Sequence, residues 1–175
     1  MVSTVDILPT ILDATGAEPA VEMQGMSLRP VLESADAEWR EYLVGEFHMH
    51  GAPWYPRRAI RDGRYKLIHN LLAATGVPSN RIDGDIGYEV SREARYDGTP
   101  IRRAFDVYAD PPEFELYDLR EDPWEFENLA GGPDVAEVED RLKAALDEWR
   151  RETDDPCLDL EFMEEMRKRV NEPGG

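Results

Sequence analysis

The distribution of apolar positions predicts a short helix at the start of the chain. Within residues 3–16, apolar side chains recur every three or four positions, which is typical of a helix with one apolar face. Ser3 or Thr4 can cap its first turn, and Gly16 fits the left-handed position that ends a helix. A helix of this length is not stable alone, so its apolar face needs a surface to pack on. This face consists of Val5, Leu8, Ile11 and Leu12.

The middle of the chain has the pattern of an antiparallel sheet. Residues 57–61 and 64–69 flank Asp62-Gly63, the dipeptide most typical of a tight hairpin. Residues 114–119 alternate apolar and polar side chains like a half-buried strand. Residues 42–48 form a further candidate strand, which makes about four strands in total.

Helices follow the sheet, and one irregular segment interrupts it. Residues 71–112 are rich in Gly and Pro, which predicts a long excursion with one short helix near 89–96. Pro133 begins an amphipathic helix with acidic residues in its first turn. We therefore predict an α+β fold, a small antiparallel sheet packed against a carboxy-terminal helix. The buried stripe of that helix consists of Val135, Val138, Leu142, Leu146 and Trp149.

These elements divide the chain into three parts. Residues 1–40 hold the first helix and a connector, and they do not belong to the sheet in any evident way. Residues 41–156 form the predicted α+β unit. Residues 157–175 form an acidic tail, in which a second amphipathic helix spans about 158–170.

Charge and composition exclude some classes of partner and function for this chain. The chain has 38 acidic and 20 basic side chains and a net charge of −18, which argues against nucleic acid or an anionic membrane as partner. Only 3 of the 20 cations are Lys, and an acid-rich, lysine-poor surface suits a salt-rich host; a cold-adapted or generally acidic proteome is the alternative. Without a long apolar run or a signal-peptide pattern, we expect a soluble protein, cytoplasmic if the sequence is complete.

One cationic region stands out in this acidic chain. All three histidines lie within residues 48–69. His48 and His50 lie two positions apart on the same predicted face, but no third ligand stands at the spacing of a metal motif. Arginine forks match the geometry of sulfate, phosphate and carboxylate, so the region is a candidate anion site. The alternative is that its arginines balance acidic residues packed nearby. The cations of this region are Arg57, Arg58, Arg61, Arg64 and Lys66.

The residues provide no evident catalytic nucleophile. Cys157 is the single cysteine, which excludes an internal disulfide framework, and the acidic residues around it raise a thiol pKa rather than lower it. The chain has no Gly-x-Ser-x-Gly, P-loop or dinucleotide motif. We interpret Asp118, Asp122 and the acids after them as solvated turn residues, with calcium binding as the alternative.

Four motifs follow one another in a specific order. They are Asp6-Ile7-Leu8-Pro9-Thr10, Gln24-Gly25-Met26-Ser27-Leu28, the hairpin of residues 58–68, and residues 115–130, which read Glu-Leu-Tyr-Asp-Leu-Arg-Glu-Asp-Pro-Trp-Glu-Phe-Glu-Asn-Leu-Ala. In this order they resemble the carboxy-terminal portion of the sulfatase family. Within the family, the chain is most similar to heparan N-sulfatases (sulfamidases) and bacterial arylsulfatase-like enzymes.

The resemblance implies part of a sulfuric ester or sulfamate hydrolase. Residues 1–40 then correspond to the end of an α/β catalytic domain, and the sheet to the family's small domain. Sulfatases use a formylglycine made in a Cys/Ser-x-Pro-x-Arg motif, which is absent around Cys157 and around Ser91. We therefore expect no catalytic residue, metal or other cofactor in this chain, and no activity alone, because calcium and formylglycine belong to the catalytic domain.

The resemblance also assigns a role to the cationic region. The family's small domain lies beside the active-site mouth, and its loops help to shape the substrate pocket. His48, His50, Arg57 and Arg58 are therefore candidate substrate-binding residues for a sulfated or acidic glycan.

Two further hypotheses stay open. In one, the chain is a stand-alone module that binds an acidic glycan without cleaving it. In the other, it docks onto a separate catalytic chain, or onto a second copy of itself, through the apolar face of helix 3–16. A truncated piece leaves this face uncovered, whereas an independent module covers it within its own fold.

Overall fold

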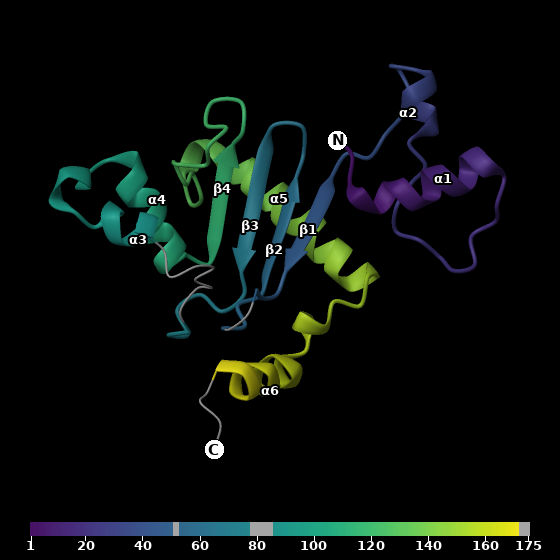
Figure 1. The fold of residues 1–175 in the computed structure, drawn as a ribbon. Coiled ribbons are helices and arrows are strands. Elements are labelled where there is room, and N and C mark those ends of the chain that lie inside the picture. The colour runs from purple at the N-terminus through teal and green to yellow at the C-terminus, as the bar shows by residue number, and fades with distance from the viewer. Residues whose placement is uncertain (51–52, 78–85, 172–175) are drawn as a thin grey trace. The chain divides into compact units, whose positions relative to one another are not determined.

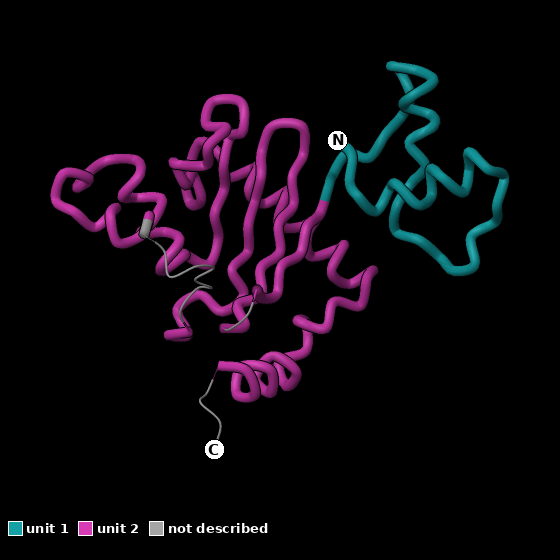
Figure 2. Tube along the Cα trace, viewed as in Figure 1, with its two compact units in different colours: residues 1–43 teal, residues 44–175 magenta. Residues whose placement is uncertain are grey.

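The computed structural model describes residues 1–50, 53–77 and 86–171. It divides the chain into two compact units, Met1–Leu43 and Val44–Gly175 (Figure 2). Among the described residues, no helix combines the length and the apolar character needed to cross a bilayer.

The first unit contains the helix predicted at residues 3–16. A 3₁₀ turn, η1 (Thr4–Asp6), leads into α1 (Ile7–Thr15), and Gly16 ends the helix in the left-handed conformation with φ of 69°. Asp6 of η1 accepts a hydrogen bond from the Ser3 amide at 2.7 Å, which completes the predicted cap. A second short helix, α2 (Arg29–Glu33), follows.

Two of the sequence motifs pack against each other in this unit. The buried Asp6 carboxylate accepts from the Met26 amide at 3.0 Å and also pairs with Arg40. The Thr10 hydroxyl accepts from the Leu28 amide at 2.9 Å. A Cβ at Gly25 would lie 1.9 Å from the Val5 carbonyl oxygen, so only glycine permits this approach.

The second unit is built on a four-stranded antiparallel sheet, as predicted. Its strands are β1 (Leu43–Phe47), β2 (Arg57–Arg61), β3 (Tyr65–Asn70) and β4 (Phe114–Asp118), in the order β1-β2-β3-β4 (Figure 1). The hairpin around Asp62-Gly63 joins β2 to β3. Its turn is stabilised by the Asp62 carboxylate, which accepts from the amides of Arg64 and Tyr65. The fold class is therefore α+β.

One face of the sheet carries the main core. A 3₁₀ turn, η3 (Pro133–Val135), begins the long helix α5 (Ala136–Glu152), which contacts β2 and β3 and crosses the sheet diagonally in Figure 1. Neighbouring strands pair Ile60 with Leu67 and Leu67 with Leu116. These side chains are buried together with Leu142 and Leu146 of α5, two residues of the predicted stripe.

The expected excursion at residues 71–112 is more ordered than its composition suggested. It contains α3 (Ile86–Ser91), the 3₁₀ turn η2 (Ala94–Tyr96) and α4 (Pro100–Ala109), whereas one short helix near 89–96 was predicted. The Thr99 side chain accepts from the Arg102 amide and Pro100 occupies the first helical position. Thr99-Pro100 therefore begins a helix and does not mark a loop. Residues 78–85 of this segment lie outside the described residues.

A second core cluster joins the end of the chain to the segment before β2. After η4 (Pro156–Leu158), the helix α6 (Leu160–Asn171) packs Phe162 and its neighbours against Trp54 and Tyr55. The ring centroids of Trp54 and Phe162 are 6.3 Å apart in an edge-on arrangement. The other members of the cluster are Leu71, Leu72, Val77, Cys157, Met163, Met166 and Val170.

Candidate functional site

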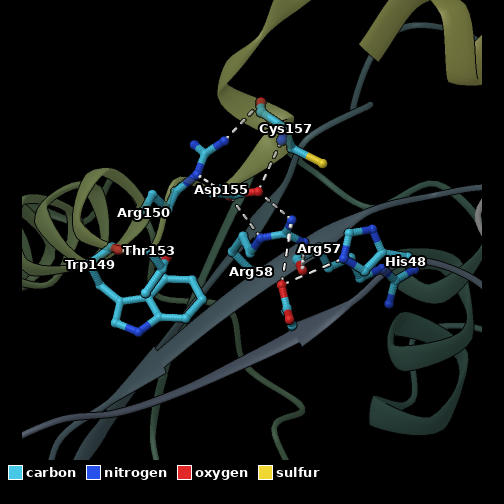
Figure 3. Close-up of polar contacts among 9 residues, drawn as sticks. His48, Arg57, Arg58, Trp149, Arg150, Thr153, Asp155 and Cys157 are labelled. Carbon is cyan, nitrogen blue, oxygen red and sulfur yellow. Dashed lines mark hydrogen bonds and ion pairs between the residues drawn. The ribbon is translucent and has the colours of Figure 1, made fainter. Parts of the chain in front are cut away.

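A buried ion network connects β2 to the turn after α5 (Figure 3). Arg58 has no exposed side-chain surface and donates from Nε and Nη2 to Asp155, at 2.9 and 2.6 Å. Arg150, near the end of α5, donates from Nε to the same carboxylate at 2.7 Å. The Cys157 amide donates to Asp155 Oδ1 at 3.0 Å. Two buried guanidinium groups therefore share one carboxylate.

The charges in this network stabilise one another against burial. Burial alone would raise the pKa of Asp155, but hydrogen bonds from Arg58 and Arg150 hold that pKa far below its ordinary value of 3.8. Burial likewise opposes the charge of Arg58, and its bonds to Asp155 raise the Arg58 pKa above the ordinary value. Asp155 is therefore ionised throughout the physiological range.

The network extends toward the surface through Glu46 and His48. Glu46 Oε2 lies 3.7 Å from Arg58 Nη2 and 3.5 Å from His48 Nε2. The His48 side chain is 38% exposed, so it is accessible while Arg58 is not. One carboxylate thus lies between a buried guanidinium and an accessible imidazole.

Arg57 faces a different environment from Arg58. Adjacent residues of a strand point to opposite faces of the sheet, and Arg57 lines a cleft of about 320 Å³ on the face away from the buried network. Its guanidinium lies 5.2 Å from the centre of the Tyr55 ring. Arg57 Nε is buried and has no hydrogen-bond partner among the described residues. Arg57 as a whole is half-buried, so only other parts of its side chain reach solvent.

The walls of this cleft mix apolar and polar groups. Ile68 and Tyr108 contribute apolar surface from β3 and α4, and Lys66 pairs with Glu125 through both carboxylate oxygens, at 2.8 and 2.7 Å. Tyr117 donates to the buried Glu115 at 2.5 Å. Burial, and then this bond, raise the Tyr117 pKa far above 10.0, so the phenol stays protonated.

The structure distributes the four predicted site residues between two faces. His48 and Arg58 are brought together through Glu46, whereas Arg57 lines the cleft. His50 is exposed just after β1. Direct contact with a ligand requires accessible atoms, and the Arg58 side chain has none. Arg58 therefore has the geometry of a residue that positions its neighbours. The contacts of His48, His50 and Arg57 with a substrate remain predictions.

Several charges of the cationic region have structural partners. Arg64 donates from Nε to Asp118 at 2.9 Å, and Asp118 is buried. The interpretation of Asp118 as a solvated turn residue was therefore wrong, because β4 extends to this residue and holds it beside β3. His69 stacks on Phe114 at a centroid distance of 4.3 Å. Burial and then the Arg150 charge lower the His69 pKa, so this histidine is neutral and part of the packing.

The described residues do not fit a sulfatase's calcium site, and the sequence lacks the formylglycine motif. Within the described ranges, no three His, Cys, Asp or Glu side chains gather as metal ligands. Cys157 is buried in the second core cluster, and burial raises the pKa of its thiol.

Asp155 and Asn171 are the important residues that the sequence pattern did not indicate. Asn171 Oδ1 accepts from the Trp54 amide at 2.7 Å, and its Nδ2 donates to the Trp54 carbonyl at 2.9 Å. Each residue reaches a partner about a hundred positions away in the sequence. The alternative that the arginines of the cationic region balance nearby acidic residues is what Arg58 shows with Asp155.

The fold and these sequence motifs match the carboxy-terminal portion of the sulfatase family. Residues 1–76 match the family model described as N-sulphoglucosamine sulphohydrolase, C-terminal. The chain is 30% identical over 172 residues to the N-sulphoglucosamine sulphohydrolase of Homo sapiens, covering 90% of this chain and 34% of that protein. It is 30% identical over 150 residues to an ulvan-active sulfatase of Formosa agariphila, covering 83% and 28%. The resemblance to the sulfatase family is therefore confirmed.

A solved structure supports the same conclusion. The protein BT4656, in complex with its substrate D-glucosamine-2-N,6-O-disulfate, superposes with a TM-score of 0.56 at 26% identity. The match covers 87% of this chain and 25% of BT4656. The chain thus spans about a third or less of the length of these relatives.

Proposed function

We propose that this chain supplies the carboxy-terminal part of a sulfatase-type hydrolase that acts on a sulfated amino sugar. The observation that carries the proposal is the position of the accessible cationic groups. His48, His50 and Arg57 all lie within the 76 residues that match the N-sulphoglucosamine sulphohydrolase model. Two relatives of the chain are named for, or bound to, N-sulfated glucosamine.

Each candidate residue has a separate task in this proposal. His48, beside Glu46, donates a hydrogen bond to a sulfate or hydroxyl oxygen of the sugar. Arg57, which is half-buried and lines the cleft, offers its guanidinium to a second oxygen acceptor. Arg58 does not touch the ligand, but holds Glu46 and through it His48. These residues bind and orient; they do not cleave the bond.

The catalytic groups come from outside this chain in the proposal. The Cys/Ser-x-Pro-x-Arg motif is absent from the sequence, and the described residues contain no suitable metal cluster. The chain alone is therefore expected to bind weakly and to release no sulfate.

The first unit provides a docking surface for the catalytic domain in this proposal. Val5, Leu8 and Ile11 are 50%, 56% and 53% exposed, although their spacing is that of a packed helix face. An apolar stripe of this kind supports the hypothesis that α1 packs on a further domain. Pairing of two copies through α1 is the alternative, and sedimentation velocity of the chain at increasing concentration distinguishes the two.

Binding of N-sulfated glucosamine to the isolated chain tests the proposal. We expect saturable NMR shifts at His48, His50 and Arg57, and about tenfold weaker binding in His48→Ala and in Arg57→Ala, which each lose one charged hydrogen bond. Arg120→Ala, which removes an exposed cation elsewhere, should bind like the unaltered chain. Equal binding by all four proteins would refute the assignment of these residues.

An activity measurement separates the proposal from a non-catalytic glycan-binding module. The chain is inserted in place of the corresponding portion of the human relative, and sulfate release is followed with and without His48→Ala. An active chimera whose KM rises while kcat stays nearly constant supports a part in the substrate pocket. Tight binding by the isolated chain together with an inactive chimera would favour the independent module.

A further inference from the structure

The segment that carries the candidate binding residues has few contacts of its own. We define the binding segment as residues 46–50 and 53–58. Within it, the Tyr55 amide donates to the His48 carbonyl at 2.9 Å, which ties the part before β2 to the part after β1. The Pro56 carbonyl also accepts from the Leu71 amide at 3.2 Å, where the segment enters β2. Further support for Trp54 comes from the last quarter of the chain.

The first support is the side-chain amide of Asn171. It pairs with both backbone groups of Trp54, at 2.7 Å to the amide nitrogen and 2.9 Å to the carbonyl oxygen. This reciprocal pair imitates the pairing of a neighbouring strand, and it gives a loop residue the backbone partners that a sheet would supply. Asn171 is the last residue of α6, so the helix end sets the position of Trp54.

The second support is apolar. The buried Trp54 side chain meets Phe162 edge-on and belongs to a cluster against which Met163, Met166 and Val170 of α6 also pack. These residues recur at three- and four-residue spacing along one face of the helix. The same helix therefore holds Trp54 by its ring and by its backbone.

We propose that α6 is the positioning element of the binding segment and that Asn171 is its positioning residue. This inference rests on the proposed function for its consequence in ligand binding, but its structural part is independent of any ligand. When the bonds of Asn171 are lost, the Trp54 backbone is no longer fixed relative to β2. His48 is joined to Tyr55 by a backbone hydrogen bond, and Arg57 follows Tyr55 by two residues. Both side chains then sample orientations that do not match a ligand.

The test compares three variants at one end of α6. Asn171→Ala removes both hydrogen bonds. Asn171→Asp, at neutral pH, keeps the acceptor for the Trp54 amide and loses the donor. Lys168→Ala is the matched control, because Lys168 lies on the same helix with a 59% exposed side chain. Each variant is examined by amide hydrogen exchange, by thermal unfolding, and by titration with N-sulfated glucosamine.

In Asn171→Ala we expect exchange of the Trp54 and Tyr55 amides to accelerate about tenfold, as follows from loss of a hydrogen bond, and binding to weaken about tenfold. Asn171→Asp should give intermediate values, and Lys168→Ala should match the unaltered chain. A general loss of stability would instead accelerate exchange in β3 and β4 as well. That result, or unchanged exchange at Trp54 and Tyr55, would overturn the positioning role.

Failure of the two proposals is distinguishable. If exchange at Trp54 and Tyr55 accelerates while neither Asn171→Ala nor His48→Ala alters binding, the positioning role stands and the proposed ligand site fails. If His48→Ala weakens binding and Asn171→Ala does not, the ligand site stands and the positioning role fails.

Discussion

At the scale of single residues, Asp155 determines how the second unit accommodates its buried charge. It is the one carboxylate that both Arg58 and Arg150 contact by direct hydrogen bonds. Burying an ion pair contributes little net stability, but removing one partner leaves an uncompensated charge in the interior. The cost of a substitution therefore depends on which partner is removed.

We expect Asp155→Ala to be more destabilising than Arg58→Met. The first leaves two buried guanidinium groups without their carboxylate and should cost about 3–5 kcal/mol of unfolding free energy. The second leaves Asp155 paired with Arg150 and should cost about 2 kcal/mol. Urea unfolding followed by circular dichroism measures both. An equal effect of the two substitutions would contradict the shared carboxylate.

The lowered pKa of Asp155 predicts a specific acid sensitivity. A carboxylate with a depressed pKa stabilises the fold fully above its ordinary value of 3.8, and this contribution is lost as pH falls toward the folded-state pKa. Between pH 5 and pH 2, the unaltered chain should therefore lose about 1–2 kcal/mol more than Asp155→Asn. The other carboxylates titrate in both proteins, so their contribution to the unfolding free energy cancels in the difference between the two pH profiles. Parallel pH profiles would exclude Asp155 as the source.

At the scale of elements, Gly25 connects the two motifs of the first unit. A Cβ at this position would lie 1.9 Å from a backbone oxygen of Val5, which cannot move without shifting η1. The turn of residues 23–28 and the start of the first helix therefore depend on each other.

We expect Gly25→Ala to open this contact at a cost of about 2 kcal/mol or more. Exchange of the Met26 and Leu28 amides, which donate to Asp6 and Thr10, should accelerate. Gly45→Ala is the control, because a Cβ there meets no atom within 4 Å. Slow exchange at both amides in Gly25→Ala would show that the contact is not required.

Elements with strong local signals were predictable from the sequence. Asp62-Gly63 fixed the β2–β3 hairpin, and the spacing of Leu142 and Leu146 identified the buried face of α5. Helix α4 was missed because Pro100 marks a loop as readily as a helix start. The contacts of Asp155 and Asn171 were not predictable, since a hydrogen bond across about a hundred residues leaves no trace in local periodicity.

At the scale of the whole molecule, charge is the dominant property. The net charge is −18, because 38 acidic side chains stand against 20 basic ones. Repulsion between such charges opposes the compact state, and salt screens it over about 10 Å at 0.1 M and less at higher concentration. This is the basis of the hypothesis that the chain is adapted to salt.

We expect the melting temperature to rise by about 3 °C or more between 0.05 and 1 M KCl, the equivalent of roughly 1 kcal/mol. A variant with three exposed acids of α5 neutralised, Asp140→Asn, Asp147→Asn and Glu148→Gln, should show a smaller rise. Differential scanning calorimetry measures both. A melting temperature that is constant or falls with salt would refute the hypothesis.

The contact between Asn171 and Trp54 also has a consequence for the order in which the protein is made. Translation delivers the chain from its amino end, so the hairpin and its histidines leave the ribosome well before α6 does. Trp54 remains without its partner until the final residues of α6 are synthesised. A message truncated before this helix, or a ribosome stalled there, would yield a nascent chain with its sheet in place and Trp54 without its partner on α6.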